Sequence, residues 1–173
     1  MPHMQDPLFS SSVIFICEHN KDGAMGLIIN KKFEEKNLNN LFKKVYIENE
    51  TIESLAPEIY FGGPIMLERG IVLHSSEFNI EGTIFISDDF SITSQKTVLK
   101  KLKLHKKIPY KLMLGHAGWA GKQLEREIEN GDWLIQSTTS DFIFNLNPDQ
   151  MWRQAAGSLG MDLGISEGIG GKA

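Results

Sequence analysis

Two apolar segments separated by six polar and small residues constrain the fold of this chain more than any other feature. Residues 13–17 (VIFIC) and 24–30 (AMGLIIN) are rich in aliphatic, aromatic and β-branched side chains, which favours buried strands. The connection, residues 18–23 (EHNKDG), consists of residues that are typical of turns. The pattern therefore predicts a β-hairpin near the start of the chain.

The rest of the chain predicts further strands and helices without regular alternation. Strands are expected at 58–61, 70–74, 82–87, 90–93, 110–117 and 132–138, and helices at 34–45, 95–107 after a Ser94 cap, 122–130 and 149–160. In the last helix, Asn147 is the expected cap, Pro148 the first helical residue and Gly160 the stop. This order predicts an α+β fold, a single compact domain over residues 1–173 with a glycine-rich, flexible tail at 161–173.

Charge and cysteine content exclude several classes of protein. The 173 residues carry a net charge of -4, which argues against a general nucleic-acid binder. A single cysteine cannot form an internal disulfide bond. The first residues lack the pattern of a signal peptide, and apolar runs such as 13–17 are far shorter than the ~20 residues that span a bilayer. A cytoplasmic protein that does not enter a membrane is therefore expected.

Three segments together resemble the YqgE/AlgH family of bacterial proteins. They are residues 1–30 (MPHMQDPLFSSSVIFICEHNKDGAMGLIIN), 59–74 (IYFGGPIMLERGIVLH) and 115–134 (GHAGWAGKQLEREIENGDWL), and the segment 147–162 fits the family's last helix. The resemblance implies a mixed, mainly antiparallel and partly barrel-like sheet surrounded by helices. It implies no defined reaction, and the regulatory role in the family's name derives from the alginate system.

This chain departs from the family pattern at several positions. Family members carry a short apolar strand before the MP motif, whereas this chain begins at Met1, so either the strand is absent or the start lies upstream. An absent strand would leave one sheet edge exposed. Lys31 and Lys32 replace Arg-Pro, and His116 and Lys122 stand where tyrosine and glycine are common. Near the end, Lys172 stands where the family often has histidine.

Cys17 and His19 are the first candidates for chemistry. On a regular strand they would share a face about 6.5 to 7 Å apart, which is too far for a thiolate–imidazole pair. His74 or His116, brought in by folding, would be a better partner. The structural alternative is that Cys17 is a small buried hydrophobic residue, since only a lowered pKa would make the thiol reactive.

Two glycine-rich loops are candidates for anion binding. FGGP (61–64) follows a strand, and GHAGWAGK (115–122) leads into a helix whose first N–H groups would face an anion. Neither matches a phosphate-binding P-loop or a dinucleotide fingerprint. Arg69 could bind a carboxylate or phosphate bidentately, or could form a surface ion pair. The structural alternative for the glycines is tight turns and close packing.

Metal, cofactor and DNA sites are not expected. The chain has no metal-binding motif, since CxxC, HExxH and helical histidine pairs are all missing, and we predict no cofactor. The basic cluster contains only lysines, without the aromatic side chains that would stack on bases, and is predicted to be a solvated face: Lys96, Lys100, Lys101, Lys103, Lys106, Lys107 and Lys111.

Two functional hypotheses remain. The first is a binding or regulatory protein that holds a small anionic ligand or a protein partner where the three loops meet. The second is an enzyme acting on a small anionic metabolite at the same place, with His19 or His74 as base and Glu18 as orienting acid. The predicted pocket comprises Cys17, Glu18, His19, Asn20, Asn30, Gly62, Gly63, Arg69, His74, Gly118, Trp119 and Gln123.

Overall fold

A computed structural model describes residues 7–33, 46–47, 50–51, 58–95, 97–105 and 107–160. Its strands are β1 (Ile14–Asn20), β2 (Gly23–Ile28), β3 (Tyr46–Ile47), β4 (Glu50–Thr51), β5 (Ile59–Phe61), β6 (Ile65–Ser75), β7 (Thr83–Phe85), β8 (Phe90–Thr93) and β9 (Tyr110–Ala120). Its helices are α3 (Val98–Leu104), α4 (Gln123–Glu129), α5 (Ser140–Phe144) and α6 (Pro148–Ser158).

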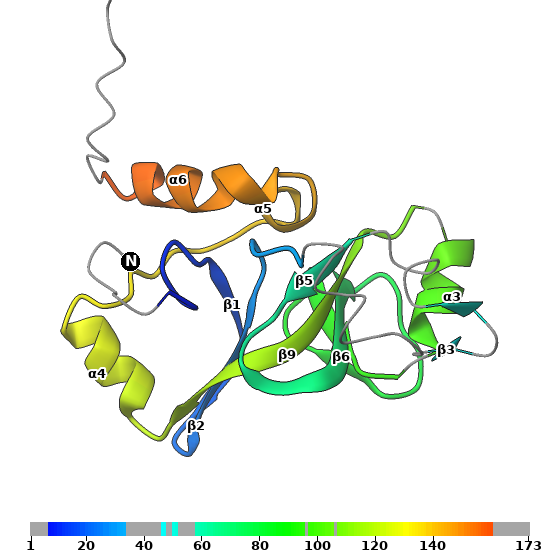
Figure 1. Ribbon diagram of the computed structural model, residues 1–173, viewed down its shortest axis with the longest axis horizontal. Coiled ribbons are helices and arrows are strands. Elements are labelled where there is room, and N and C mark those ends of the chain that lie inside the picture. Colours follow the sequence, from blue (N-terminus) through cyan, green and yellow to red (C-terminus); the bar gives the residue numbers. More distant parts are fainter. Residues whose placement is uncertain are drawn as a thin grey trace, which may run out of the picture.

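One curled sheet organises the molecule. Its strand order is β1-β2-β9-β6-β8-β7, with β5 pairing in parallel with β9, and β3 and β4 form a separate hairpin. The other pairs of the main sheet are antiparallel, and the sheet curls into a half barrel (Figure 1). The predicted α+β class with a partly barrel-like mixed sheet is confirmed.

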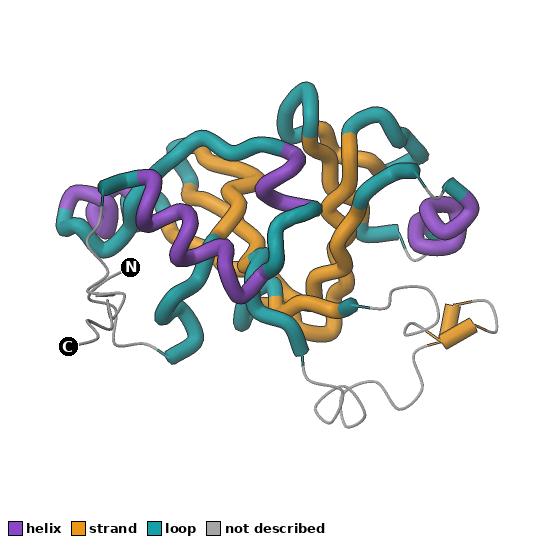
Figure 2. The backbone as a smooth tube through the Cα atoms, turned by 90° about the horizontal axis from the view of Figure 1, so that it is seen from above, coloured by secondary structure: helices purple, strands orange, loops and turns teal. Residues whose placement is uncertain are grey.

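The helices lie at two ends of the sheet. Helix α4 lies at the end formed by the β1–β2 hairpin, and α3 lies at the opposite end (Figures 1 and 2). Helix α6 passes over the top of β1 in the view of Figure 1. As predicted, Asn147 caps this helix by accepting a hydrogen bond from the Asp149 N–H, and Pro148 is its first residue.

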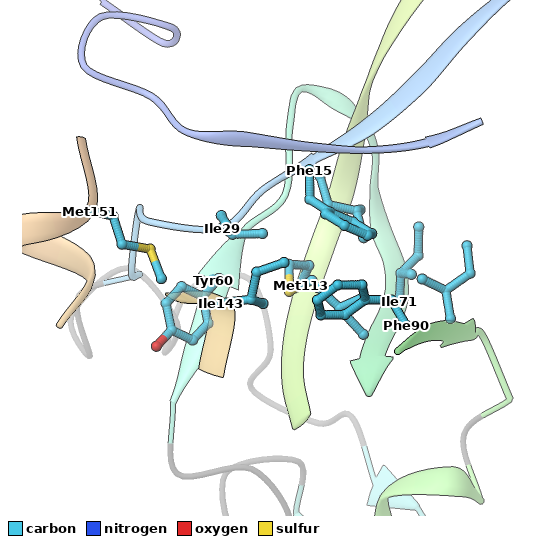
Figure 3. Packing of buried hydrophobic residues seen from close by; sticks show 11 residues of the cluster. Phe15, Ile29, Tyr60, Ile71, Phe90, Met113, Ile143 and Met151 are labelled. Atoms are coloured by element: carbon cyan, nitrogen blue, oxygen red, sulfur yellow. The ribbon is translucent and has the colours of Figure 1, made fainter. Parts of the chain in front are cut away.

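The central core lies between the sheet and the two C-terminal helices. It combines strand residues such as Phe15 and Met113 with Ile143 of α5 and Met151 of α6, all of them buried (Figure 3). A second cluster packs α3 against the sheet through Val98, Leu99 and Leu102. The sheet is therefore closed by different helices at its two ends.

Three elements differ from the sequence prediction or lie outside the described residues. Residues 132–138 have no strand pairing, although their composition predicted a strand. Helix α3 begins after Thr97 rather than after Ser94, and Thr97 makes no side-chain capping bond. The predicted helix at 34–45 and the tail at 161–173 lie outside the described residues.

Candidate functional site

The β1–β2 hairpin contains a bulge that changes where its side chains point. The register between the strands shifts between Ile16 and Glu18, so Cys17 is the extra residue. A bulge breaks the alternation of side chains between the two faces of a strand. Cys17 consequently packs against the central core, while His19 contacts Glu125 of α4. The assumption of a shared face for Cys17 and His19 is therefore wrong.

The Cys17 thiol is held in a nonreactive state. Burial raises its pKa to about 12, and the Sγ atom donates a weak hydrogen bond to the Phe15 carbonyl at 3.7 Å. A thiol with a raised pKa carries almost no thiolate at neutral pH, and the thiolate is the nucleophile. This geometry supports the structural interpretation of Cys17 as a buried hydrophobic residue.

The polar residues of the hairpin bond mainly to one another. Asn20 Nδ2 donates to Glu18 Oε1 at 2.7 Å, and Asn20 Oδ1 accepts from the Asp22 N–H at 2.8 Å, which closes the turn. His19 Nε2 lies 2.8 Å from Glu125 Oε1, with both side chains largely exposed. These contacts shape the hairpin tip and leave few groups aimed at a common ligand.

The sheet brings part of the predicted pocket together. Cross-strand pairing aligns Glu18 with Met25 and Gly118, and His19 with Ala24 and Trp119. At ~4.8 Å between neighbouring strands, Glu18 and Gly118 lie about 10 Å apart. Pairs directly opposite each other share a face, so these two rows point to opposite sides of the sheet.

Gly62 and Gly63 have a packing role. A Cβ atom on Gly62 would lie 2.3 Å from the Gly115 carbonyl oxygen, and one on Gly63 would lie 2.2 Å from the His116 carbonyl carbon. Gly63 also has a positive φ of 148°. Only glycine permits this close approach of the FGGP loop to β9, which favours the packing interpretation of this loop.

His74 lies far from the hairpin. It pairs with Tyr110, eight residues along β9 from Gly118, or roughly 26 Å away. It is fully buried, donates from Nδ1 to the Ser75 carbonyl at 2.9 Å, and accepts at Nε2 from Thr93 Oγ1 at 2.9 Å. Burial lowers its pKa, so the imidazole stays neutral. The structure thus separates His74 from the hairpin and from Gly118 and Trp119.

Arg69 and Asn30 also serve local structure. Arg69 Nη2 lies 3.5 Å from Ser94 Oγ on the surface. Burial and the nearby Arg69 charge lower the pKa of His116, whose Nδ1 has no hydrogen-bond partner among the described residues. Asn30 Oδ1 accepts from the Val13 N–H at 2.8 Å, and its Nδ2 donates to the Ser11 carbonyl at 2.9 Å. Asn30 thereby fixes the chain that enters β1.

A large apolar pocket, which we term the β1 slot, lies beside the hairpin strand at the end of the sheet. Its volume is about 380 Å³. It is lined by β1, α4, residues 133–138 and the two C-terminal helices: Ser12, Val13, Ile14, Phe15, Ile16, Ile29, Trp119, Leu124, Ile128, Trp133, Leu134, Ile135, Gln136, Ser137, Thr138, Phe142, Ile143, Trp152, Ala155, Ala156 and Leu159. Of the predicted site residues, only Trp119 lines it.

Unpaired backbone and exposed apolar side chains border the β1 slot. Strand β1 is the end strand of the sheet. Within the described residues, no backbone hydrogen bond joins its outer edge to residues 133–138. Leu134 and Ile135 are 49% and 68% exposed, and Ile16 and Leu159 are also exposed. Together these four side chains form an apolar rim.

Glu127 organises one wall of the slot. Its Oε2 accepts from the indole N–H groups of Trp119 at 2.8 Å and Trp133 at 2.7 Å, and its Oε1 accepts from Gln123 Nε2 at 2.9 Å. The two indole rings pack edge to face, 5.9 Å apart. Glu127 and Trp133 were not among the predicted site residues. The i, i+4 spacing of Gln123 and Glu127 was the one sequence signal that pointed to this face of α4.

A buried lysine lies near the start of β9. Lys111, which we had grouped with the solvated lysines, is only 5% exposed. Its Nζ donates to the Ile29 carbonyl at 3.1 Å and lies 4.4 Å from the centre of the Tyr60 ring. Burial lowers the pKa of Lys111 to about 8, while nearby Glu58 acts in the opposite direction. Its assignment to the solvated face is therefore wrong.

Metal-ligating residues do not gather in the described part of the chain. There, no group of three or more His, Cys, Asp or Glu side chains is placed to hold a metal ion. Within the same residues, no helix is long and apolar enough to cross a membrane.

Comparison with known proteins identifies the family. The AlgH-like family model matches residues 1–164, and the chain belongs to this family, as the resemblance indicated. The chain is 37% identical over its whole length to the UPF0301 protein YqgE of Salmonella newport, covering 95% of that protein. It is 38% identical over its whole length to a UPF0301 protein of Thioalkalivibrio sulfidiphilus, covering 92% of it.

Solved structures agree with the fold. The solution structure of the AlgH protein from Pseudomonas aeruginosa matches with a TM-score of 0.71 and 30% identity, covering 100% of this chain and 92% of that one. The crystal structure of a Corynebacterium diphtheriae protein matches with a TM-score of 0.65 at 20% identity, covering 89% of this chain and 80% of that one, and supports the fold alone. The family carries no defined reaction.

Proposed function

We propose that this protein is a partner-binding protein with a regulatory role, which recognises an extended apolar segment of another protein in the β1 slot. The observation that supports it is the apolar rim beside the unpaired outer edge of β1. An edge strand can pair with an added strand, whose backbone supplies hydrogen bonds while pockets receive alternate side chains. The slot offers an unpaired strand edge and an apolar pocket for side chains.

The chemistry of the slot fits binding better than turnover. Its lining is mostly aliphatic and aromatic, and such surfaces contribute affinity by removing apolar area from water. Next to it, the half-buried Cys17 thiol has a raised pKa, and His19 is engaged with half-exposed Glu125. A small anionic ligand, which the loops suggested, has less support because the hairpin's polar groups bond to one another.

Tryptophan fluorescence provides a direct test. All three tryptophans of the chain, Trp119, Trp133 and Trp152, line the slot, so an occupant changes their surroundings. We expect a hexapeptide that alternates valine and threonine to shift their emission saturably. A thermal-shift titration should rise with peptide; at 100 times Kd the expected gain is ~2.7 kcal/mol, or roughly 5 to 11 °C.

Matched variants locate the binding. Ile16→Asp places a charge at the slot and should abolish the shift, whereas Ile84→Asp on the edge strand β7, where Ile84 is 59% exposed, should leave it intact. Equal loss in both variants, or no binding by wild type, would overturn the proposal. A thermal shift with phosphorylated or carboxylate metabolites but none with the peptide would instead favour the anion-processing enzyme.

A further inference from the structure

A polar hollow adjoins the β1 slot where the chain enters β1. It lies between the first turns of α6 and residues 11, 30 and 31, and its volume is about 420 Å³. We term it the α6 hollow. Trp152 lines both spaces, and of two neighbours in the chain, Ser12 lines the slot and Ser11 lines the hollow. The apolar slot therefore continues into a polar space.

The α6 hollow lies at the start of β1, before the first residue of the strand. Ser11 has a positive φ of 53°, and the Ser12 N–H donates to the Phe9 carbonyl at 3.0 Å, so the chain turns just before β1 begins at Ile14. A strand that pairs antiparallel with β1 runs toward this turn. Such a strand brings its C-terminal end to the hollow, whereas a parallel strand would bring its N-terminal end.

The outer edge of β1 offers backbone groups for this pairing. The Ile29 N–H donates to the Val13 carbonyl at 3.0 Å, so the backbone groups of Val13 face into the sheet. Hydrogen bonding alternates along an antiparallel strand, so Ile14 and Ile16 direct their N–H and C=O groups outward. Six extended residues span about 20 Å, which suffices to pair with residues 14–16 and to reach Ser11.

The charges of the α6 hollow favour a carboxylate over an ammonium group. Lys31 and Arg153 contribute two positive charges, and Asp149 contributes one negative charge. Lys31 Nζ donates to the Pro7 carbonyl at 3.2 Å and to the Leu8 carbonyl at 2.7 Å, which holds the ammonium beside the hollow. Arg153 forms no ion pair within the described residues, and a guanidinium can bind a carboxylate bidentately. The N-terminal end of α6, which carries partial positive charge, lies at the same place.

We propose that the β1 slot receives the C-terminal end of its partner, which pairs antiparallel with the outer edge of β1 and places its terminal carboxylate between Lys31 and Arg153. This inference rests on the proposed function and specifies which part of the partner binds. Apolar side chains of the partner fill the slot, and the carboxylate fixes the direction and register of the strand. Capture of a terminal carboxylate beside an added strand combines two recurring modes of peptide recognition.

Two forms of one peptide test the role of the carboxylate. Both are N-acetylated valine–threonine hexapeptides, one with a free C-terminal carboxylate and one with a C-terminal amide. In titrations of tryptophan emission at low salt, the free acid should bind at least ~5-fold more tightly, and the ratio should fall as salt screens the charges. Equal affinities at low salt would overturn this inference and leave the proposed function standing. No saturable binding of either peptide would overturn both.

Three variants locate the carboxylate in the hollow. Arg153→Gln should reduce the ratio of the two affinities to ~2 or less, whereas Asp149→Asn should raise it by removing the competing anion. Arg126→Gln is the matched control, because it removes the same charge from an exposed position of α4 that lines neither space. A ratio in Arg153→Gln equal to that of wild type, or an equal reduction in Arg126→Gln, would overturn the inference.

A third peptide and a spin label test the chain end and its direction. An amidated hexapeptide whose last residue is glutamate carries its carboxylate on a side chain, and binding as tight as that of the free acid would overturn the assignment to a chain end. A nitroxide at the N-terminus of the free-acid peptide should weaken the NMR amide signal of Glu18 more than that of Ser11, because an antiparallel strand begins toward the hairpin tip. The reverse order, expected of a parallel strand, would also overturn the inference.

Discussion

The two ends of the curled sheet differ in how their polar groups are hydrogen-bonded. At the β6–β8–β7 end, hydrogen bonds connect half-buried to fully buried polar groups: the Ile80 N–H donates to Thr83 Oγ1, the Thr83 and Thr93 hydroxyls are 3.2 Å apart, and buried Thr93 bonds to buried His74. At the β1 end, backbone groups along the edge and the Thr138 hydroxyl find no partner within the described residues, and an apolar pocket adjoins the strand.

This difference separates stability from recognition. A fully satisfied buried network rigidifies the structure around it, whereas open edges and exposed apolar rims favour association. Strand β9 connects the two ends, because it pairs with β2 at one end and with β6 at the other. We therefore expect mutations at the closed end to change folding, and mutations at the open end to change binding.

The largest expected contrast comes from one substitution placed at both ends. Leu73→Ala removes a side chain that is fully buried in the central core, and should lower the free energy of unfolding by about 2–5 kcal/mol. Leu134→Ala, at a residue 49% exposed on the slot rim, should change it by at most about 0.5 kcal/mol. Urea denaturation measures both; equal losses would contradict the separation of the two ends.

A second pair of variants compares a bonded and an unbonded hydroxyl. Thr93→Val keeps the shape of a fully buried side chain but leaves His74 Nε2 without its donor, and should cost about 1–3 kcal/mol. Thr138→Val removes a hydroxyl that has no partner within the described residues and should be neutral or stabilising. A clear loss of stability at Thr138 would show that its hydroxyl is bonded outside the described part of the chain.

Sequence patterns predicted most of the strands and helices because local chemistry determines them. The apolar runs of the β1–β2 hairpin and the Asn147 cap with Pro148 appear where expected. The predicted strand at 132–138 is not formed, because residues of β-forming composition need a partner strand. The neighbouring edge of β1 lies across the slot from them. Pairing is a tertiary property that no local window contains.

The candidate site was less predictable because it, too, depends on tertiary structure. The bulge at Cys17 sends it and His19 in different directions, and strand alternation alone could not reveal that shift. His74 was grouped with the hairpin on residue type, although the strand order places it at the other end. The slot is built from several separate segments and contains few polar residues, so among its lining residues only Trp119 was predicted.

Alkaline pH should stabilise the protein through Lys111, whose Nζ donates to the Ile29 carbonyl. Its folded-state pKa is about 8, whereas the unfolded chain keeps the proton until about pH 10.4. Between these values the unfolded state binds more protons, so the free energy of unfolding rises with pH, by about 1 kcal/mol from pH 8 to 9. Lys111→Met should remove this slope in urea titrations.

Cys17 acts in the opposite direction. Burial raises the pKa of its thiol to about 12, whereas the unfolded thiol titrates near ~8.5, so the unfolded chain loses this proton first and the thiol's contribution to stability falls as the pH rises. Cys17→Ala should remove this opposing contribution and steepen the rise in the free energy of unfolding above pH 8. A wild-type slope that persists in Lys111→Met would mean that another group titrates between pH 8 and 9.

The smallest effect on stability and binding is expected for the polar pair His19 and Glu125. His19 and Glu125 form their contact in solvent, where side-chain entropy and hydration offset most of the attraction between charges. His19→Gln should leave the urea midpoint unchanged and should preserve peptide-induced tryptophan shifts, because neither residue lines the slot. Loss of the shift in His19→Gln with an unchanged midpoint would extend the binding surface onto the hairpin tip, and the open end of the sheet would then include polar as well as apolar recognition.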